Sequence, residues 1–166
     1  MIIPISGIGK VRMLRAQGPW ETKSGGRLEV AVAIPWKELG NVFFDYDQEE
    51  LQRLAIDIRG FRIYRISGLA RGRIGGNEFH RIRTEMAFCI KGLVLWTCQD
   101  LEGSKKELVL CPGVGILLPP FIMHTYKVLE DASELEVVAN TIFVPDDKRT
   151  HDTYSADAFR ELAGKP

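Results

Sequence analysis

A run of glycines, acids and one histidine at fixed spacing occupies the middle of this sequence. Gly72 is followed after five residues by Glu78, and His80 lies two positions beyond that glutamate. Glu85 follows His80 after four residues, and Gly92 follows Glu85 after six. The run therefore gathers carboxylate and imidazole groups, which can bind a metal or transfer a proton, in one short stretch.

A second spaced segment begins about twenty residues later. Gly113 is followed after five residues by Pro119, and His124 follows that proline after four more. The chain has three histidines, and His80 and His124 are two of them. A single such histidine is usually a hydrogen-bonded structural residue, and a single glutamate is usually exposed. Their joint occurrence at these spacings favours a functional site.

Strand geometry decides which of these side chains can meet. Residues two positions apart on a strand point to the same face, so Glu78 and His80 share a face. Glu85 has the opposite parity and joins them only if the chain turns or bulges over residues 82–84. His124 comes from a separate strand. We expect the four groups to converge in the mouth of a barrel, where they could hold a divalent metal or transfer protons.

The composition predicts one globular domain over residues 1–166. The chain is 45% hydrophobic, and its 22 basic residues balance its 22 acidic ones, so nothing attracts it to nucleic acid or anionic membranes. No apolar run approaches the ~20 residues of a membrane span, and the N-terminus lacks the pattern of a secretion signal. Three cysteines without C-x-x-C spacing predict buried free thiols and a reducing, cytoplasmic location.

Many short apolar runs at regular intervals predict an all-β sandwich or barrel with one or two short helices. Strands are expected over residues 28–34, 61–66, 83–90, 93–98, 107–110, 115–119, 123–129 and 135–144. A helix is expected over 47–54, where Asp47 can cap an acidic first turn, and a second over 153–162. Residues 1–26 are expected to be irregular.

Two further groups of side chains could serve a ligand. Tyr64, Trp96, Phe121 and Tyr126 could line a pocket or belong to the core. A basic run could be a solvated strand edge or a site for a phosphorylated ligand, since guanidinium groups bind phosphate oxygens in pairs. The run consists of Arg62, Arg65, Arg71, Arg73, Arg81 and Arg83.

The two spaced segments resemble the two motifs of the cupin superfamily. The first, G-x5-H-x-H-x3,4-E-x6-G, matches residues 72–92 with Glu78 in place of the first histidine. The second, G-x5-P-x-G-x2-H-x3-N, matches residues 113–128 with Phe121 in place of glycine and Val128 in place of asparagine. The resemblance implies a double-stranded β-helix, or jelly-roll, barrel with its core over 60–145.

Within the superfamily the chain is most similar to the dTDP-4-keto-6-deoxyhexose 3,4-ketoisomerases and, more distantly, to the dTDP-4-dehydrorhamnose 3,5-epimerases. The similar segments are residues 25–30, 61–66, 118–124, 128–131, 140–146 and 154–159. The chain departs from both families at Gly75-Gly76, where they carry R-G, and at Glu78. It departs from the epimerases at Ile142-Phe143, where they carry a tyrosine acid. These departures argue against standard 3,5-epimerase chemistry.

The resemblance implies an isomerase that moves a proton alpha to the carbonyl of a keto-sugar nucleotide and needs no cofactor. His80 is the expected base, because its unperturbed pKa lies near neutrality. Glu78 would orient its ring or carry a second proton, and His124 matches the later active-site histidine. The expected substrate-binding residues are Arg62, Arg71, Arg73, Tyr64 and Tyr126.

Two alternatives stay open at this point. One is a metal-dependent cupin, a dioxygenase or a metal-assisted isomerase, that holds Fe, Mn, Ni or Zn through Glu78, His80, Glu85 and His124. The other is a cupin that binds a sugar without turnover. In each case the partner is a small molecule, and the resemblance implies a homodimer, for which residues 1–35 could supply a pairing arm.

Overall fold

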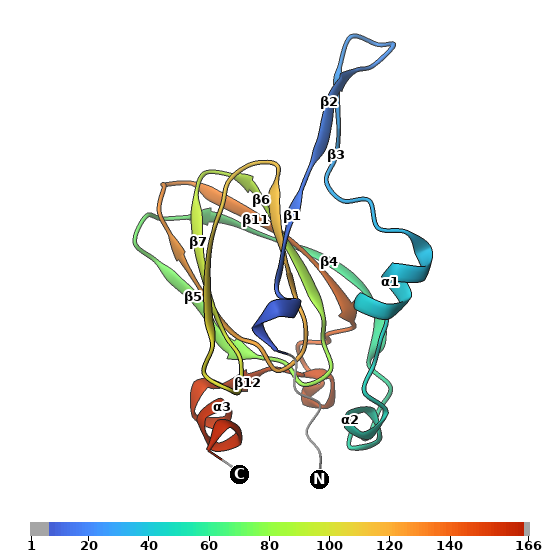
Figure 1. Ribbon diagram of the computed structural model, residues 1–166, viewed down its shortest axis with the longest axis vertical. Helices are drawn as coiled ribbons and strands as arrows, with labels where there is room; N and C mark the ends of the chain where they lie inside the picture. Colours follow the sequence, from blue (N-terminus) through green and yellow to red (C-terminus); the bar gives the residue numbers. More distant parts are fainter. Residues whose placement is uncertain (1–6, 165–166) are drawn as a thin grey trace.

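Alternating apolar residues build two antiparallel sheets that face each other in the computed structural model, which describes residues 7–164 (Figure 1). Within these residues the first sheet runs in the order β1 (Arg12–Arg15), β9 (Val114–Leu118), β6 (Glu85–Lys91), β11 (Ser133–Thr141) and β4 (Arg59–Leu69). The second runs β12 (Tyr154–Ser155), β5 (Ile74–Phe79), β10 (Met123–Val128), β7 (Val94–Gln99) and β8 (Lys105–Leu110). This alternation of strands between two sheets is the expected jelly roll.

Short helices and one hairpin surround the two sheets. The helices are α1 (Trp36–Val42), α2 (Gln48–Gln52) and α3 (Ala156–Ala163), with single 3-10 turns at Ile8–Lys10 and Lys148–Thr150. The strands β2 (Gln17–Glu21) and β3 (Arg27–Val30) form a hairpin that extends away from the sandwich (Figure 1). No helix among residues 7–164 is long and apolar enough to cross a membrane.

The core lies between the sheets, and two smaller apolar clusters lie outside them. Inside, fully buried side chains from both sheets pack together, among them Trp96, Ile116 and Leu135. Outside the first sheet, Phe43 at the end of α1 packs against strand side chains of β6 and β9. Outside the second sheet, Phe159 of α3 packs on aromatic side chains near the end of β5. Burial of these apolar surfaces is the main stabilising term of the fold.

The sandwich is joined along one edge and open along the other. Near β1 and β8, the Lys106 ammonium donates to the carbonyl of Val11 at 2.7 Å and links the two sheets. At the opposite edge, β4 ends the first sheet, while β12 and β5 end the second, and β4 pairs only with β11 among the described strands. Within the described residues, β4 and the part of β5 that β12 leaves unpaired are therefore free strand edges, and we call this side of the sandwich the open edge.

Most of the expected strands and both expected helices are confirmed within a few residues. Asp47 caps α2 as expected, its side chain accepting from the N–H of Glu50. Each of the expected free thiols is confirmed among the described cysteines, with Cys89 and Cys98 buried and Cys111 half-buried. The expected turn over 82–84 is also present, and it carries the chain from the second sheet to the first.

The N-terminal part differs from expectation. Residues 12–21 form strands rather than irregular chain, and the expected strand over 28–34 ends at Val30. The helix α1 was not expected, because it has no side-chain cap and contains Gly40; packing of its apolar side against the first sheet stabilises it. Of the expected arm over 1–35, β1 pairs with β9 of the same chain, and residues 1–6 lie outside the described part.

Candidate active site

A β-bulge aims two residues of β5 into the barrel. His124 of β10 lies opposite Glu78, whereas Tyr126, two residues on, lies opposite Gly75, three residues back. The extra residue of β5 is accommodated where Gly76 and Asn77 have positive φ angles of 73° and 65°. The bulge resets the strand's parity, so that Gly75 and Glu78 both face inward.

Gly75 is required by its neighbour across the strands. A Cβ atom at position 75 would collide with the ring and hydroxyl of Tyr126. The Tyr126 ring in turn lies 5.3 Å from Trp96, centroid to centroid, on the third strand of this face. Tyr126 therefore fills the space that a side chain at position 75 would otherwise enter.

Asp152 fixes the loop that carries His80. Its carboxylate accepts from the backbone N–H groups of Arg81, Ile82 and Arg83, at 3.1, 2.9 and 2.7 Å. Its carbonyl oxygen lies 2.6 Å from Nδ1 of His80. Because a carbonyl can only accept, Nδ1 carries the proton, and Nε2 of His80 is left toward the barrel interior without a partner among residues 7–164.

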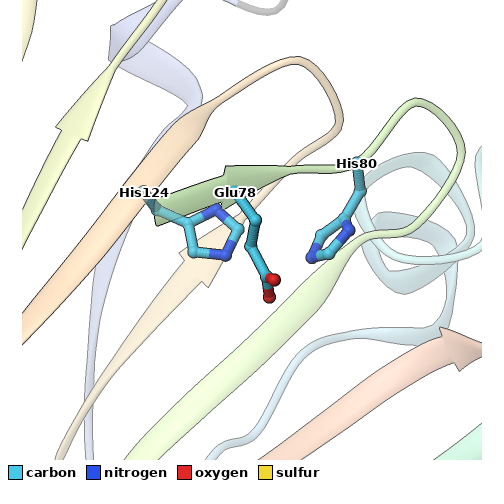
Figure 2. A group of neighbouring side chains, drawn as sticks. All are labelled: Glu78, His80 and His124. Carbon is cyan, nitrogen blue, oxygen red and sulfur yellow. The ribbon is translucent and has the colours of Figure 1, made fainter. Parts of the chain in front are cut away.

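His124 presents the same nitrogen from the other side. Its Nδ1 donates to the carbonyl of Ile122 at 3.0 Å, which leaves Nε2 for the interior. The imidazole centroids of His80 and His124 lie 5.2 Å apart, and both residues are buried. Figure 2 shows the carboxylate of Glu78 between the two rings. Burial, and then the electrostatic interaction with His80, lower the pKa of His124 to about 4.

Glu85 stands beside this pair and links it to two further groups. Its Oε1 accepts from the hydroxyl of Tyr64 at 3.0 Å and from Nη1 of Arg83 at 3.2 Å, while Oε2 lies 3.6 Å from Nε2 of His80. Burial acts to raise the pKa of Glu85, but its interactions with His80 and with the Arg83 guanidinium outweigh burial and hold the pKa below its usual value. Glu85 is therefore a carboxylate in the folded protein.

Three of the four expected ligands come together. Glu78, His80 and His124 each offer one ligand atom, and these atoms lie within 4.8 Å of one another. Two imidazole nitrogens and one carboxylate suit a first-row divalent cation and equally suit proton transfer. Glu85 lies next to this group, its oxygens directed at Tyr64, Arg83 and His80.

The expected substrate-binding residues separate into two places. Arg62 and Tyr64 of β4 lie at the open edge, where the Arg62 guanidinium stacks between the rings of Tyr64 and Phe143, at 4.9 and 5.3 Å from their centroids. Arg71 and Arg73 are exposed and lie beyond the other end of β5, away from His80. Only Arg62, Tyr64 and Tyr126 of the expected set thus lie with the histidines.

Two residues of this site were not singled out from the sequence. Arg83 entered only as part of the basic run, yet its guanidinium is buried inside the barrel and contacts Glu85. Asp152 gave no signal, because it follows the loop it holds by some 70 positions. Side chains that act through backbone contacts at such separations show no spacing pattern.

A cleft of about 490 Å³ lies elsewhere, on the outer side of the first sheet. Its lining includes Arg12, Tyr46, Arg81 and Pro120 but none of the residues that converge inside the barrel. We place the chemistry at the histidines rather than in this cleft, because the imidazole and guanidinium nitrogens without hydrogen-bond partners among the described residues lie beside the histidines.

Comparison with known proteins gives a family and a fold. A family model described as "FdtA: WxcM-like, C-terminal" matches residues 46–158. No curated protein sequence is significantly similar to the chain. Among solved structures, QdtA, a sugar 3,4-ketoisomerase from Thermoanaerobacterium thermosaccharolyticum in complex with TDP, is 18% identical with a TM-score of 0.63, covering 94% of this chain and 96% of its own.

Two other solved structures are similar to a comparable degree. The WlaRB TDP-quinovose 3,4-ketoisomerase from Campylobacter jejuni is 14% identical with a TM-score of 0.62, covering 93% of this chain and 99% of its own. The dTDP-4-dehydrorhamnose 3,5-epimerase from Elizabethkingia anophelis is 13% identical with a TM-score of 0.57, covering 93% and 78%. The shared fold is the cupin jelly roll expected from the two motifs.

The lowered pKa of His124 makes stability depend on pH. The unfolded chain binds a proton at this residue below about pH 6.5, whereas the folded protein does so only below about 4. As pH falls through this window the unfolded state gains protons first, so the free energy of unfolding should fall by about 3 kcal/mol. Urea denaturation between pH 7 and 4, with EDTA present, measures this dependence.

His124→Gln should flatten that dependence, whereas His151→Gln, which lies outside the cluster, should keep it. If His124→Gln retains the full wild-type slope between pH 6.5 and 4, burial of a neutral His124 is wrong.

Proposed function

The chain belongs to the FdtA, WxcM-like C-terminal family, and on that premise we propose that it is an isomerase that moves a proton alpha to the carbonyl of a keto-sugar nucleotide. The observation that carries the proposal is the pair of buried imidazoles with their Nε2 atoms turned to one interior space, on either side of Glu78. The sugar 3,4-ketoisomerases that share the fold support the substrate class.

The chemistry requires one proton to leave a carbon and one to arrive at its neighbour. His80 Nε2 takes the proton from the carbon next to the carbonyl, and the C–H electron pair becomes a carbon–carbon double bond. The carbonyl π electrons pass to oxygen, which gives an enediolate, and a proton moves from the adjacent hydroxyl to that oxygen. Glu78, as the second proton carrier, then delivers a proton to the former carbonyl carbon and is reprotonated from His80, so no oxidant or cofactor is needed.

The open edge between β4 and β5 is where the nucleotide would leave the barrel. Arg62 is half-buried there and is the best placed of the expected arginines to contact a diphosphate. Tyr64 and Tyr126 would contact the sugar beside the histidines. Arg71 and Arg73 would take part only if the nucleotide extends along β5. Free thiols in the barrel support the proposed cytoplasmic location.

Deuterium incorporation tests the reaction. In deuterated water the protein should convert TDP-4-keto-6-deoxyglucose into a product that carries deuterium on the former carbonyl carbon, as followed by mass spectrometry and NMR. His80→Gln should slow incorporation by about 10²–10⁴-fold, the usual contribution of a general base. His151→Gln should leave the rate unchanged.

Absence of incorporation by the wild-type protein would sink the proposal for this substrate. If the same nucleotide sugar nevertheless raises the melting temperature, the protein binds a sugar without turnover, which is the outcome expected of a non-catalytic cupin.

A metal-dependent activity is the second candidate, and the convergence of Glu78, His80 and His124 is the observation that favours it. His80 Nε2 is buried without a partner among the described residues, as the donor set of a metal site would require. A bound Fe, Mn, Ni or Zn ion would act as a Lewis acid toward the carbonyl oxygen or toward dioxygen. The isomerase proposal comes first because the family and fold favour it.

Elemental analysis separates the two candidates. A metal cupin should carry close to one first-row metal per chain after gentle purification and reconstitution, and Glu78→Gln should lower that content, because it removes the only anionic ligand of the three. Asp157→Asn, on the exposed face of α3, is the matched control. Less than about a tenth of a metal per wild-type chain would count against this candidate.

We further propose that two copies of the chain associate as a homodimer. The outer face of the edge strand β4 exposes Phe61 by 60% and Ile63 by 57%, side by side on one face of the strand. The projecting hairpin exposes Trp20 by 49% and Leu28 by 50%. An edge strand with exposed apolar residues is a surface that pairing would cover.

Light scattering should give the mass of two chains for the wild type at micromolar concentration. Phe61→Ser with Ile63→Ser should shift the population toward one chain, because apolar area that the dimer buries is lost. Arg65→Gln on the same face serves as the control. A wild-type mass of one chain would contradict the dimer.

A further inference from the structure

Arg83 is a buried cation with one nitrogen unused. Its exposed fraction is 4%, so its guanidinium lies almost wholly inside the protein. Nε donates to Thr141 Oγ1 at 3.2 Å and Nη1 donates to Glu85 Oε1 at 3.2 Å. Nη2 is buried and has no hydrogen-bond partner within residues 7–164. A buried charged donor without an acceptor is costly, so a structural arginine would be expected to use all its nitrogens.

The surroundings of Arg83 hold a second guanidinium but only one contacting carboxylate among residues 7–164. Arg62 lies close enough to act on it electrostatically and also has a buried nitrogen, Nε, with no acceptor among the described residues. Glu85 is the carboxylate that Arg83 contacts, and its charge also acts on Arg62. Tyr64 is neutral, because burial raises its pKa. Two positively charged groups thus share one carboxylate, and an anionic oxygen of a ligand would supply the missing hydrogen-bond acceptor.

The position of Arg83 relative to His80 shows where that oxygen would lie. Glu85 holds Arg83 on one carboxylate oxygen and faces His80 Nε2 with the other. The proposed base and the guanidinium that carries the unused Nη2 therefore contact opposite oxygens of one planar carboxylate. If the substrate carbon that loses its proton lies beside His80, the carbonyl oxygen on the neighbouring carbon would lie toward Arg83.

We propose that Arg83, through Nη2, is the catalytic electrophile that binds the substrate's carbonyl oxygen and stabilises the enediolate. The inference rests on the proposed function and deepens it. When His80 takes the proton, the C–H pair forms the carbon–carbon double bond and the carbonyl π pair moves to oxygen. The negatively charged enediolate oxygen accepts a hydrogen bond from Arg83, which keeps its own protons throughout. The negative charge disappears when the former carbonyl carbon is protonated and the new carbonyl forms.

A donor preorganised at this oxygen acts mainly in the transition state, because full negative charge exists only after proton removal. The competing role is ground-state binding of a phosphate or carboxylate of the substrate. If Arg83 had that role, its replacement would weaken substrate binding and leave the rate of the chemical step unchanged. Arg83 lies deep beside the base, whereas Arg62 lies half-buried at the open edge, so we assign the reacting oxygen to Arg83.

The test compares Arg83→Gln and Arg83→Lys with the wild type in turnover of TDP-4-keto-6-deoxyglucose. Arg83→Gln should lower kcat by about 10²–10³-fold, the usual effect of removing one oxyanion donor, with KM changed by less than about threefold. Deuterium incorporation should fall in parallel, because the enediolate forms in that step. Arg83→Lys keeps the charge and should lose less. Arg65→Gln, an exposed arginine paired with Glu136 on the outer face of β4, is the control.

A kcat unchanged in both Arg83 variants, or a loss confined to KM, overturns the inference while leaving the proposed function intact. Melting curves show which variants fold. If Arg83→Gln does not fold, Arg83→Lys by itself decides the test. If the wild type neither turns over nor exchanges this substrate, the proposed function fails for that substrate. Acetate, a planar oxyanion, then tests whether Arg83 binds an anionic oxygen.

At constant ionic strength, acetate should then raise the melting temperature of the wild type more than that of Arg83→Lys. Such a difference keeps Arg83 as an oxyanion donor without the proposed substrate. Equal shifts, or no shift in either protein, overturn the assignment.

Discussion

Asp152 accepts hydrogen bonds from three consecutive backbone N–H groups in the loop after β5, and its own carbonyl accepts from His80. One residue near the C-terminus therefore sets both the path of that loop and the tautomer of the proposed base. The loop carries the chain from one sheet to the other and delivers Arg83 and Glu85 to the interior. If Asp152 did not hold it, these groups would lose their common orientation, because isolated loop backbone has many conformations of similar energy.

The bulge in β5 is the second constraint on the site. It places Glu78 opposite His124 and Gly75 opposite Tyr126, where strict alternation would have turned one of each pair outward. The departures at Gly75-Gly76 and at Glu78 argue, as residues, against standard 3,5-epimerase chemistry. In the structure they are coupled, because Tyr126 occupies the room above Gly75 and the charge of Glu78 acts on its phenol. Gly75 and Glu78 thus both have Tyr126 as a neighbour in the interior.

Expectations from sequence succeeded where a local pattern carries the information. The strands β4, β7 and β10 alternate apolar and polar residues, and a hairpin between β7 and β8 follows from the polar turn between them. Expectations failed where packing decides. The helix α1 depends on Phe43 and its neighbours meeting the outer face of the first sheet, and β1 depends on pairing with β9, about a hundred residues away in sequence.

The sequence by itself predicted an all-β fold, because short runs with period-two alternation are a local property of the chain. The two spaced motifs, through the resemblance they carry, predicted the jelly roll and the meeting of Glu78, His80 and His124. Only the tertiary structure decided which nitrogen each histidine presents, that Arg83 lies inside while Arg71 and Arg73 lie outside, and that Asp152 orients the base. These features arise from contacts between residues far apart in sequence, and their energies depend on burial and on partners that no linear spacing specifies.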